Sequence, residues 1–249
     1  MSQSKSRELI PTNPVAADSV YSGRSSQLLT GSSDLGVICK RLFDVVAASL
    51  CLLIFAPLFL ASACWIRYVS KGSVLFRQER IGQNGNPFLM FKFRSMAVNT
   101  DTRAHEDHVR TLMNSGLPMK KLDALGDSRI IRGGNILRAS CVDELPQLWN
   151  VIRGDMSLVG PRPCTQNEYK RYSISEKRRS KAKPGMTGFW QVHGKNKTTF
   201  RRMIAMDILY FRKQSIWLDL TILTKTIPAV LTQLTEARLN QQNSQGGNS

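Results

Sequence analysis

The chain has 249 residues, enough for one catalytic domain with its own core, and 35 Lys and Arg against 18 Asp and Glu give a net charge of +17. Such a field attracts polyanions, so nucleic acid, an anionic bilayer and phosphorylated substrates are all candidate partners. The five cysteines are odd in number and form no Cys-x-x-Cys pair, which argues against a disulfide framework or a zinc site and fits a reducing cytosolic environment.

Residues 1–36 are rich in Ser, Gly, Thr and Pro, predict a disordered tail and lack the apolar segment of a signal peptide. Residues 37–70 contain an uncharged apolar run, Val45–Ile66, that is long enough for a transmembrane helix. Pro57 divides it into arms of about 18 Å, too short for a hydrocarbon core of about 30 Å. Both flanks are basic, and basic flanks prefer the cytoplasm. The run therefore predicts a re-entrant, proline-broken membrane helix, with a single span around a tolerated proline as the alternative.

The predicted catalytic domain, residues 71–235, begins with a β-hairpin. Two strand-like segments flank a turn that contains Asn84-Gly85. In the second segment Lys92 and Arg94 alternate with phenylalanines, which places both cations on one face of the strand. This face is either a solvated basic surface or a pair of phosphate contacts.

Two helices are expected next. The first is polar and covers residues 100–121. The second covers Ser140–Arg153, where apolar residues form one helical stripe. Ser140 followed by Asp143 matches a capping box, and Gly154 ends the helix. Pro146 fits poorly inside it, and the alternative is that the helix starts a few residues later.

The rest of the domain alternates loops and helices. Residues 154–163 predict a turn, a short strand and a rigid loop, and residues 183–188 predict another loop punctuated by Pro and Gly. Helices are expected over 199–212 and 215–235, and the second has an apolar face that suits either an interfacial membrane helix or packing on the core. Residues 236–249 are polar and predict a second disordered tail.

The sharpest chemical feature is the carboxylate pair Asp143-Glu144. An ionised Asp143 can attack phosphorus, while Glu144 can bind a cation or move a proton. The structural alternative is that Asp143 is only a capping residue. Arg138, Arg162 and the two hairpin cations are candidates to lie nearby, because a diphosphate needs such donors and arginine offers it a bidentate fork.

A set of motifs in fixed order closely resembles the bacterial sugar transferases, or monotopic phosphoglycosyl transferases. The resemblance covers residues 40 to 230 and becomes specific through the order of the motifs rather than through any one of them. The motifs are Lys40-Arg-Leu-Phe-Asp44, the apolar run with its proline, Phe76-Arg-Gln-Glu-Arg-Ile-Gly82, Lys92-Phe-Arg-Ser-Met96, Asp143-Glu-Leu-Pro-Gln-Leu-Trp-Asn150, Gly154-Asp-Met-Ser-Leu-Val-Gly-Pro-Arg-Pro163 and Pro184-Gly-Met-Thr-Gly188.

The resemblance implies a two-step reaction in an α+β domain that is anchored by a re-entrant helix and by interfacial amphipathic helices. The residue matching Asp143 attacks the β-phosphate of a UDP-sugar, releases UMP, and passes the sugar phosphate to polyprenyl (undecaprenyl) phosphate. Glu144 matches the position that serves Mg²⁺. Positions for phosphate or nucleotide binding match Arg138, Arg162, Lys92, Arg94, Pro184, Gly185, Thr187, Gly188 and Gln191.

The resemblance also implies a location and partners. The catalytic domain is expected on the cytoplasmic face of the bacterial inner membrane, where it starts exopolysaccharide assembly for downstream glycosyltransferases and needs no nucleic acid. We call Asp143-Glu144 the dyad. The three residues before it, Ser140-Cys-Val, differ from the sequence Arg/Lys-Ser/Thr-Ile/Leu that is more usual at these positions in the family. Neither the sugar nor the oligomeric state follows from the sequence.

The rival hypothesis is a basic membrane-tethered protein that binds nucleic acid without catalysis. It explains the charge and the apolar run, but it gives no role to Asp143-Glu144. The basic cluster of residues 177–183 could serve such a protein or could face anionic lipid headgroups. Salt-dependent retention of DNA by the solubilised protein distinguishes the two hypotheses.

Overall fold

The computed structural model describes residues 34–97, 103–119, 129–194 and 197–246. The predicted N-terminal tail lies outside these residues, except for positions 34–36, which begin the first helix. In chain order the elements are α2 (Asp34–Ile54), α3 (Ala56–Val69), β1 (Leu75–Ile81), the 3₁₀ turn η1 (Gln83–Gly85), β2 (Pro87–Phe93), α4 (Arg103–Ser115), α5 (Gly134–Ala139), η3 (Val142–Glu144), α6 (Gln147–Arg153), β3 (Ser157–Val159), α7 (Gln166–Arg171), η4 (Glu176–Lys181), β4 (Gly185–Thr187), α8 (Phe189–Gly194), α9 (Phe200–Lys213) and α10 (Ile216–Gly246).

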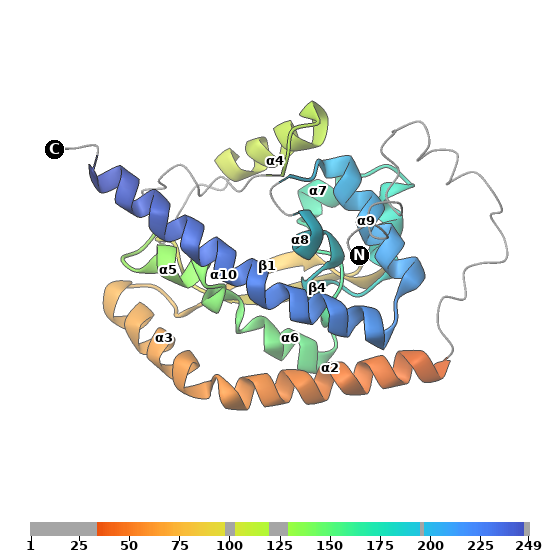
Figure 1. The fold of residues 1–249 in the computed structure, drawn as a ribbon, viewed down its shortest axis with the longest axis horizontal. Helices are drawn as coiled ribbons and strands as arrows, with labels where there is room; N and C mark the ends of the chain where they lie inside the picture. The colour runs from red at the N-terminus through yellow and green to blue at the C-terminus, as the bar shows by residue number, and fades with distance from the viewer. Residues whose placement is uncertain (1–33, 98–102, 120–128, 195–196, 247–249) are drawn as a thin grey trace, which may run out of the picture.

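The fold is mixed α and β, as predicted, with helices around two small sheets. In Figure 1, α2 and α3 lie along one edge of the molecule and α10 runs across its length. The main core joins buried residues of both sheets to helices from the two ends of the chain, including Ala48 of α2, Met90 of β2, Val159 of β3 and Ile222 of α10. A second core cluster lies around α9 and the loops that precede it.

The predicted hairpin is confirmed. β1 and β2 pair antiparallel in a register that runs from Leu75 opposite Phe93 to Ile81 opposite Pro87. Asn84 and Gly85 take positive φ values of 57° and 86° in the turn. Asn and Gly tolerate this left-handed conformation better than other residues, so the dipeptide sets the position of the turn.

The second sheet corrects the prediction of a simple loop over 183–188. Residues 185–187 form β4, which pairs parallel with β3 through Ser157 opposite Gly185 and Val159 opposite Thr187. The two backbone segments approach so closely that a Cβ on Gly160 would lie 2.2 Å from the carbonyl oxygen of Lys183. The glycines that suggested a loop are instead required by the contact between two backbones.

The apolar N-terminal segment is broken, as predicted. Phe55 separates α2 from α3, the two helices are bent by 62°, and Pro57 occupies the first turn of α3. Proline is tolerated there because first-turn amides have no partner within the helix, whereas deeper in a helix its ring would clash with the preceding turn. Within the described residues, only this bent pair, and no individual helix, has the length and apolar composition needed to cross a bilayer.

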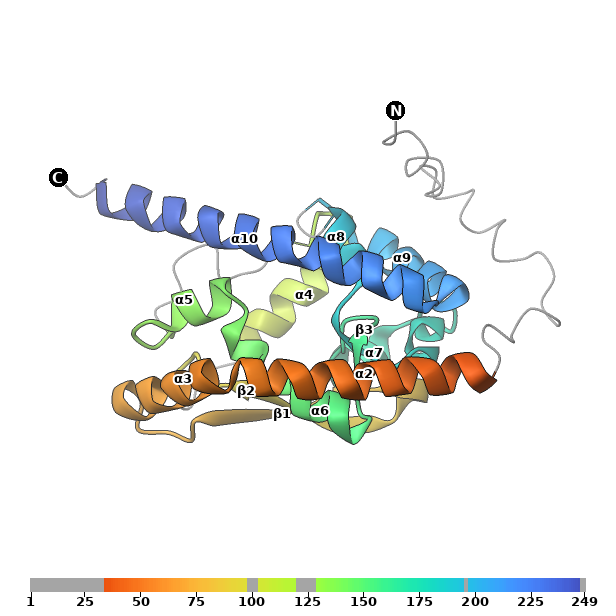
Figure 2. The same cartoon turned by 60° about the horizontal axis from the view of Figure 1, so that its bottom comes forward.

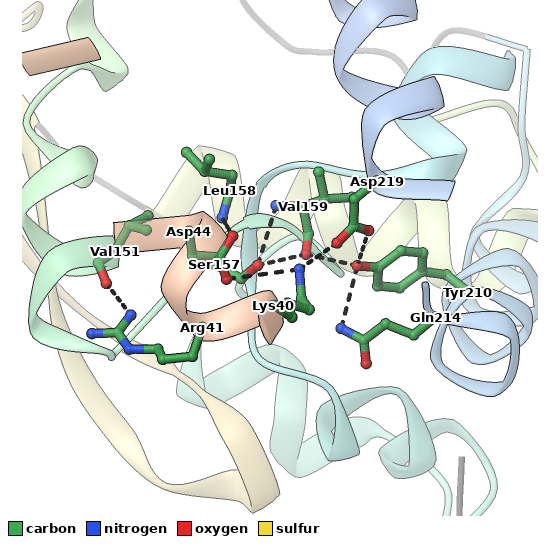
Figure 3. Close-up of polar contacts among 10 residues, drawn as sticks. All are labelled: Lys40, Arg41, Asp44, Val151, Ser157, Leu158, Val159, Tyr210, Gln214 and Asp219. Atoms are coloured by element: carbon green, nitrogen blue, oxygen red, sulfur yellow. Dashed lines mark hydrogen bonds and ion pairs between the residues drawn. The ribbon is translucent and has the colours of Figure 1, made fainter. Parts of the chain in front are cut away.

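A buried polar network joins α2 to β3, α9 and α10 (Figure 3). Lys40 of α2 lies with its Nζ 2.6 Å from Oδ2 of Asp219 in α10 and 3.7 Å from Oδ2 of Asp44. Asp44 accepts a hydrogen bond from the amide of Leu158 in β3. The Tyr210 hydroxyl of α9 contacts both Oδ1 of Asp219 and the carbonyl of β3 residue Val159. The Lys40-to-Asp44 motif therefore connects the membrane helix candidate to the strand that leads to Arg162.

The helix expected over Ser140–Arg153 is wrong in its first half. α5 ends at Ala139, η3 forms a separate turn, and α6 begins after Pro146. The predicted capping box is absent, because the Ser140 hydroxyl donates backwards to carbonyls of α5. Proline can begin a helix but cannot continue one, so Pro146 divides the segment. Gly154, with φ of 93°, ends α6 as predicted.

The two C-terminal helices are confirmed as α9 and α10. α10 continues to Gly246, where a disordered tail was expected from residue 236, and its far end extends past α5 (Figures 1 and 2). The sequence of this extension contains Ala, Arg, Leu and Gln, which are good helix formers. Of the two alternatives for the apolar face, packing on the core is confirmed at Ile222, whereas Trp217 and Ile227 are exposed and the interfacial alternative stays a prediction.

Candidate functional site

The carboxylate pair lies in the short turn η3, between α5 and α6. Asp143 is buried with 7% of its surface exposed, and the carboxylate of Glu144 lies 3.2 Å from the Lys92 ammonium group. Cys141, directly before the turn, has a positive φ of 57°. This conformation is uncommon for a residue with a side chain and often marks functional sites. The backbone thus turns sharply to present the two carboxylates to the end of β2.

Arg138 lies on the same side of the domain as the dyad. It is in the last turn of α5, and its Nη1 donates to the hydroxyl of Ser95, just after β2. The predicted phosphate ligand Arg94 points elsewhere, because its Nε donates to the carbonyl of Ser73 at 2.6 Å. The dyad, Lys92 and Arg138 therefore form one group, called here the dyad group.

Arg162 belongs to a second group of predicted site residues. Its loop follows β3 and contacts β4, where the amide of Gly185 donates to the carbonyl of Pro161. Pro184 accepts from the amide of Ser157, so it also lies against β3. The remaining members of this group, which we call the loop group, are Thr187, Gly188 and Gln191; the carbonyl of Gly188 accepts the Gln191 amide in the first turn of α8. Sequence motifs far apart in the chain are thus brought together.

The loop group has a positive field. Arg80 of β1 is buried, and its pKa is lowered first by burial and then by the charge of Arg162. Glu168 acts in the opposite direction, with its carboxylate 4.0 Å from Arg80. The positive charges of Arg80 and Arg162 make this part of the surface attractive to anions.

α10 contacts both groups and sets their spacing. Thr226 shares a hydrogen bond of 2.9 Å with Thr187 of the loop group, and Gln233 donates to the carbonyl of Arg138 of the dyad group. These two positions are about 10 Å apart along a helix that rises 1.5 Å per residue. One helix thus contacts the loop group and the dyad group at positions about two turns apart.

Asn150 is a central residue to which the sequence analysis assigned no role. Its buried amide side chain accepts from the amide of Phe91 and donates to the carbonyl of Leu89 and the carboxylate of Asp155. It therefore ties α6 to β2 and to the turn before β3. The available signal was a polar amide inside a short apolar helix, because a buried amide must find partners.

The acidic residues of the dyad group suit one kind of metal site. Among the described residues, no cluster of three or more His, Cys, Asp and Glu side chains could form an all-protein cage. Mg²⁺ is usually held by one or two carboxylates together with substrate phosphates, and Asp143 and Glu144 supply carboxylates of this kind. The donor set fits a magnesium ion that arrives with a diphosphate.

Comparison with known proteins follows the same motifs. Residues 35–233 match the family model described as bacterial sugar transferase. The chain is 40% identical over 197 residues to the exopolysaccharide production protein ExoY of Rhizobium meliloti. The aligned region covers 79% of this chain and 87% of that protein.

Two further relatives have names that state a reaction. The UDP-glucose:undecaprenyl-phosphate glucose-1-phosphate transferase of Caulobacter vibrioides is 43% identical over 201 residues, which covers 78% of this chain and 70% of the relative. The undecaprenyl-phosphate galactose phosphotransferase of Salmonella typhimurium is 37% identical over 193 residues, which covers 77% of this chain but 40% of the relative. The chain belongs to the bacterial sugar transferase family and is an enzyme of the phosphoglycosyl transferase type.

Proposed function

We propose that this enzyme transfers a sugar 1-phosphate from a UDP-sugar to polyprenyl phosphate in two steps, through a phosphosugar carried on Asp143. The names of the relatives support the substrate classes. The observation that carries the proposal is the dyad itself: two adjacent carboxylates in a strained turn, one buried and one paired with Lys92. A purely structural turn has no need to place two adjacent acids at a lysine.

In the first step a carboxylate oxygen of Asp143 attacks the β-phosphorus of the UDP-sugar. An acyl phosphate bond forms, the bond between that phosphorus and the bridging oxygen breaks, and UMP leaves with the electron pair. Lys92 and Arg138 of the dyad group neutralise charge that builds up on the phosphoryl oxygens. Arg162 of the loop group holds the diphosphate with its two-pronged guanidinium group.

Glu144 is the proposed ligand of Mg²⁺. When bound, the ion supplies Lewis-acid neutralisation of the diphosphate and of the leaving UMP. In the free enzyme the Glu144 carboxylate lies 3.2 Å from the Lys92 ammonium. Lys92 therefore balances the charge of Glu144 in the free enzyme. When Glu144 binds Mg²⁺, the Lys92 side chain must turn toward the substrate phosphate.

In the second step a phosphate oxygen of the lipid carrier attacks the same phosphorus, and the carboxylate of Asp143 leaves. This step requires the site to lie at a membrane surface. α2 exposes an apolar stripe opposite its buried residues Asp44 and Ala48, formed by Leu42, Val46, Leu50 and Leu53. We place α2 and α3 in one leaflet as a re-entrant segment, with the exposed apolar side chains of α10 at the interface.

This topology puts the catalytic domain on the cytoplasmic face of the inner membrane, where nucleotide sugars are made. The product is a polyprenyl diphosphate sugar that downstream glycosyltransferases extend into an exopolysaccharide or a related glycan. The name of the ExoY relative supports this glycan class.

The test is the amount of UMP released before any lipid acceptor is added. Purified enzyme with Mg²⁺ and each of a panel of UDP-sugars should release UMP in an amount limited by the enzyme, and the productive sugar identifies the donor. Intact-protein mass spectrometry should then find a sugar-phosphate adduct on Asp143. Asp143→Asn should abolish both signals, whereas raised Mg²⁺ should partly restore Glu144→Gln. The matched control is Glu79→Gln, which changes an exposed carboxylate on β1.

Each alternative has its own result. A single displacement gives neither acceptor-independent UMP nor an adduct. An adduct on Glu144 reverses the two roles and keeps the reaction class. Retention of DNA that weakens with salt, without UMP release from any donor, supports the nucleic-acid hypothesis instead.

A further inference from the structure

The loop that carries Arg162 is held by all of its carbonyl groups. Four consecutive carbonyls, from residue 161 to residue 164, each accept a hydrogen bond. Their donors are, in order, the amide of Gly185 at 2.9 Å, Nη2 of Arg179 at 3.0 Å, Nη1 of Arg80 at 3.4 Å and the amide of Ile81 at 2.9 Å. The outer two donors come from strands, whereas the inner two are buried arginine side chains.

Arg179 is the donor that reaches the carbonyl of Arg162 itself. It is only 3% exposed, although it lies in a run of basic residues. Its Nη1 donates to the Tyr172 hydroxyl, and its Nη2 lies 2.5 Å from the carboxylate of Asp207 in α9. Asp207 is 1% exposed, so the ion pair is enclosed on both sides.

A buried ion pair usually stabilises a core less than apolar side chains of the same volume do. Removing two charges from water costs several kcal/mol per ion, and well-packed apolar residues often stabilise a fold better. Such a pair is best explained when one partner has a further task. Here the guanidinium group supplies a donor in a fixed direction to a loop whose two prolines, Pro161 and Pro163, have no amide hydrogen of their own.

We propose that Arg179, oriented by Asp207, is a positioning residue for the transferase reaction that fixes the backbone of Arg162 so that the Arg162 side chain meets the substrate phosphate in one geometry. This inference rests on the proposed phosphate-binding role of Arg162. Misplacing a substrate-binding group by about 1 Å can cost roughly 100-fold in rate, which is why a loop of this kind needs a rigid support.

The first arm of the test is a double-mutant cycle with the loop arginine. Arg179→Lys keeps the charge beside Asp207 but cannot reach three acceptors at once. We expect it to lower kcat/KM for UMP release about 10-fold or more, with a thermal midpoint close to that of the native protein. In an Arg162→Lys background, where the fork is already lost, the same change should cost less than 3-fold by the reasoning of coupled sites. Equal losses in both backgrounds would overturn the positioning role.

The second arm does not depend on catalysis, so it separates failure of this inference from failure of the proposed function. Hydrogen exchange of the amides of Gly185 and Ile81, which hold the ends of the loop, should be faster in Arg179→Lys than in the native protein. The matched control is Arg178→Lys, an exposed neighbour that should change neither exchange nor activity. Unchanged exchange in Arg179→Lys would refute the inference even if no donor sugar were found. Asp207→Asn serves as a second variant and should give the same direction in both arms.

Discussion

Replacing Lys40 by methionine tests whether the buried network of Figure 3 holds α2 on the catalytic domain. The Lys40 side chain is 13% exposed and lies between two carboxylates, Asp44 and Asp219, whose side chains are 3% and 0% exposed. Methionine has a similar length and no charge. The variant therefore leaves two acids buried without their cation while preserving most of the packing.

The expected loss of stability follows from this geometry. Removing one partner of a buried ion pair costs about 3–5 kcal/mol, because the other charge stays buried. Asp219 keeps its hydrogen bond from Tyr210, and Asp44 keeps that from the amide of Leu158, so the lower end of about 3 kcal/mol applies. For a chain of this length, this corresponds to a fall in thermal midpoint of roughly 6–12 °C.

The assay is thermal unfolding in one detergent, with the pH varied. Burial raises the pKa of Asp219, whereas Lys40 lowers it, so the variant should raise it further. A raised carboxyl pKa means that the folded state holds its proton more tightly than the unfolded state, so the variant gains stability relative to the native protein as the pH falls. The double variant Lys40→Met/Asp219→Asn should be no less stable than Lys40→Met alone.

The control is Lys213→Met at the exposed end of α9, which should shift the midpoint by less than about 1 °C. The reasoning is refuted if Lys40→Met unfolds at the same temperature as the native protein. It is also refuted if the double variant shows the simple sum of the two single losses, because the two side chains would then not interact.

Three further predictions test the fold, the pH dependence and the topology. Gly160→Ala should prevent recovery of folded protein, because its Cβ would overlap the backbone of the second sheet. Gly116→Ala has open space around it and only the strain of a positive φ of 64°, about 1 kcal/mol, so it should fold. Burial raises the pKa of Asp207 to about 6. Protonation then removes the charge that orients Arg179, so UMP release should fall as the pH drops below 6, while the contribution of Asp207 to the free energy of unfolding should rise as the pH falls from 6 to 3.8. Both quantities are measured as a function of pH. Thiols introduced at Ser25 and Ser173 should both escape a membrane-impermeant reagent applied to intact cells, and labelling of the former alone would show a single membrane span.

Turn residues and apolar periodicity in the sequence predicted the elements that depend on neighbouring residues alone. The hairpin follows from a dipeptide that accepts positive φ, and α9 and α10 follow from apolar periodicity. β4 was missed because it is three residues long and contains Gly185, whose reason for being glycine is a neighbouring backbone far away in the chain. A close approach between distant segments leaves no periodic pattern at either one.

The roles of charged residues were harder to predict. Arg179 stands in a basic run that is typical of a solvated surface, yet it is buried against Asp207. Only the fold reveals which member of such a run points inward. Lys92 contacts Glu144, whereas Arg94, on the same strand face in the prediction, donates to the carbonyl of Ser73 just past the end of the strand pairing.

α10 shows why an apolar helix at the end of the chain also matters for the site. Three of its polar side chains contact three different parts of the molecule: Asp219 pairs with α2, Thr226 contacts β4 and Gln233 holds α5. These positions recur every seven residues, so they lie on nearly the same face of the helix and are spaced by about 10 Å. One helix, with Pro228 between its second and third contact positions, therefore links the proposed membrane segment to the loop group and the dyad group. Apolar periodicity read from the sequence does not reveal these three polar contacts, because buried Ile222 shares the inward side of α10 with Asp219 and Thr226. The contacts become visible only when their three partners are in place.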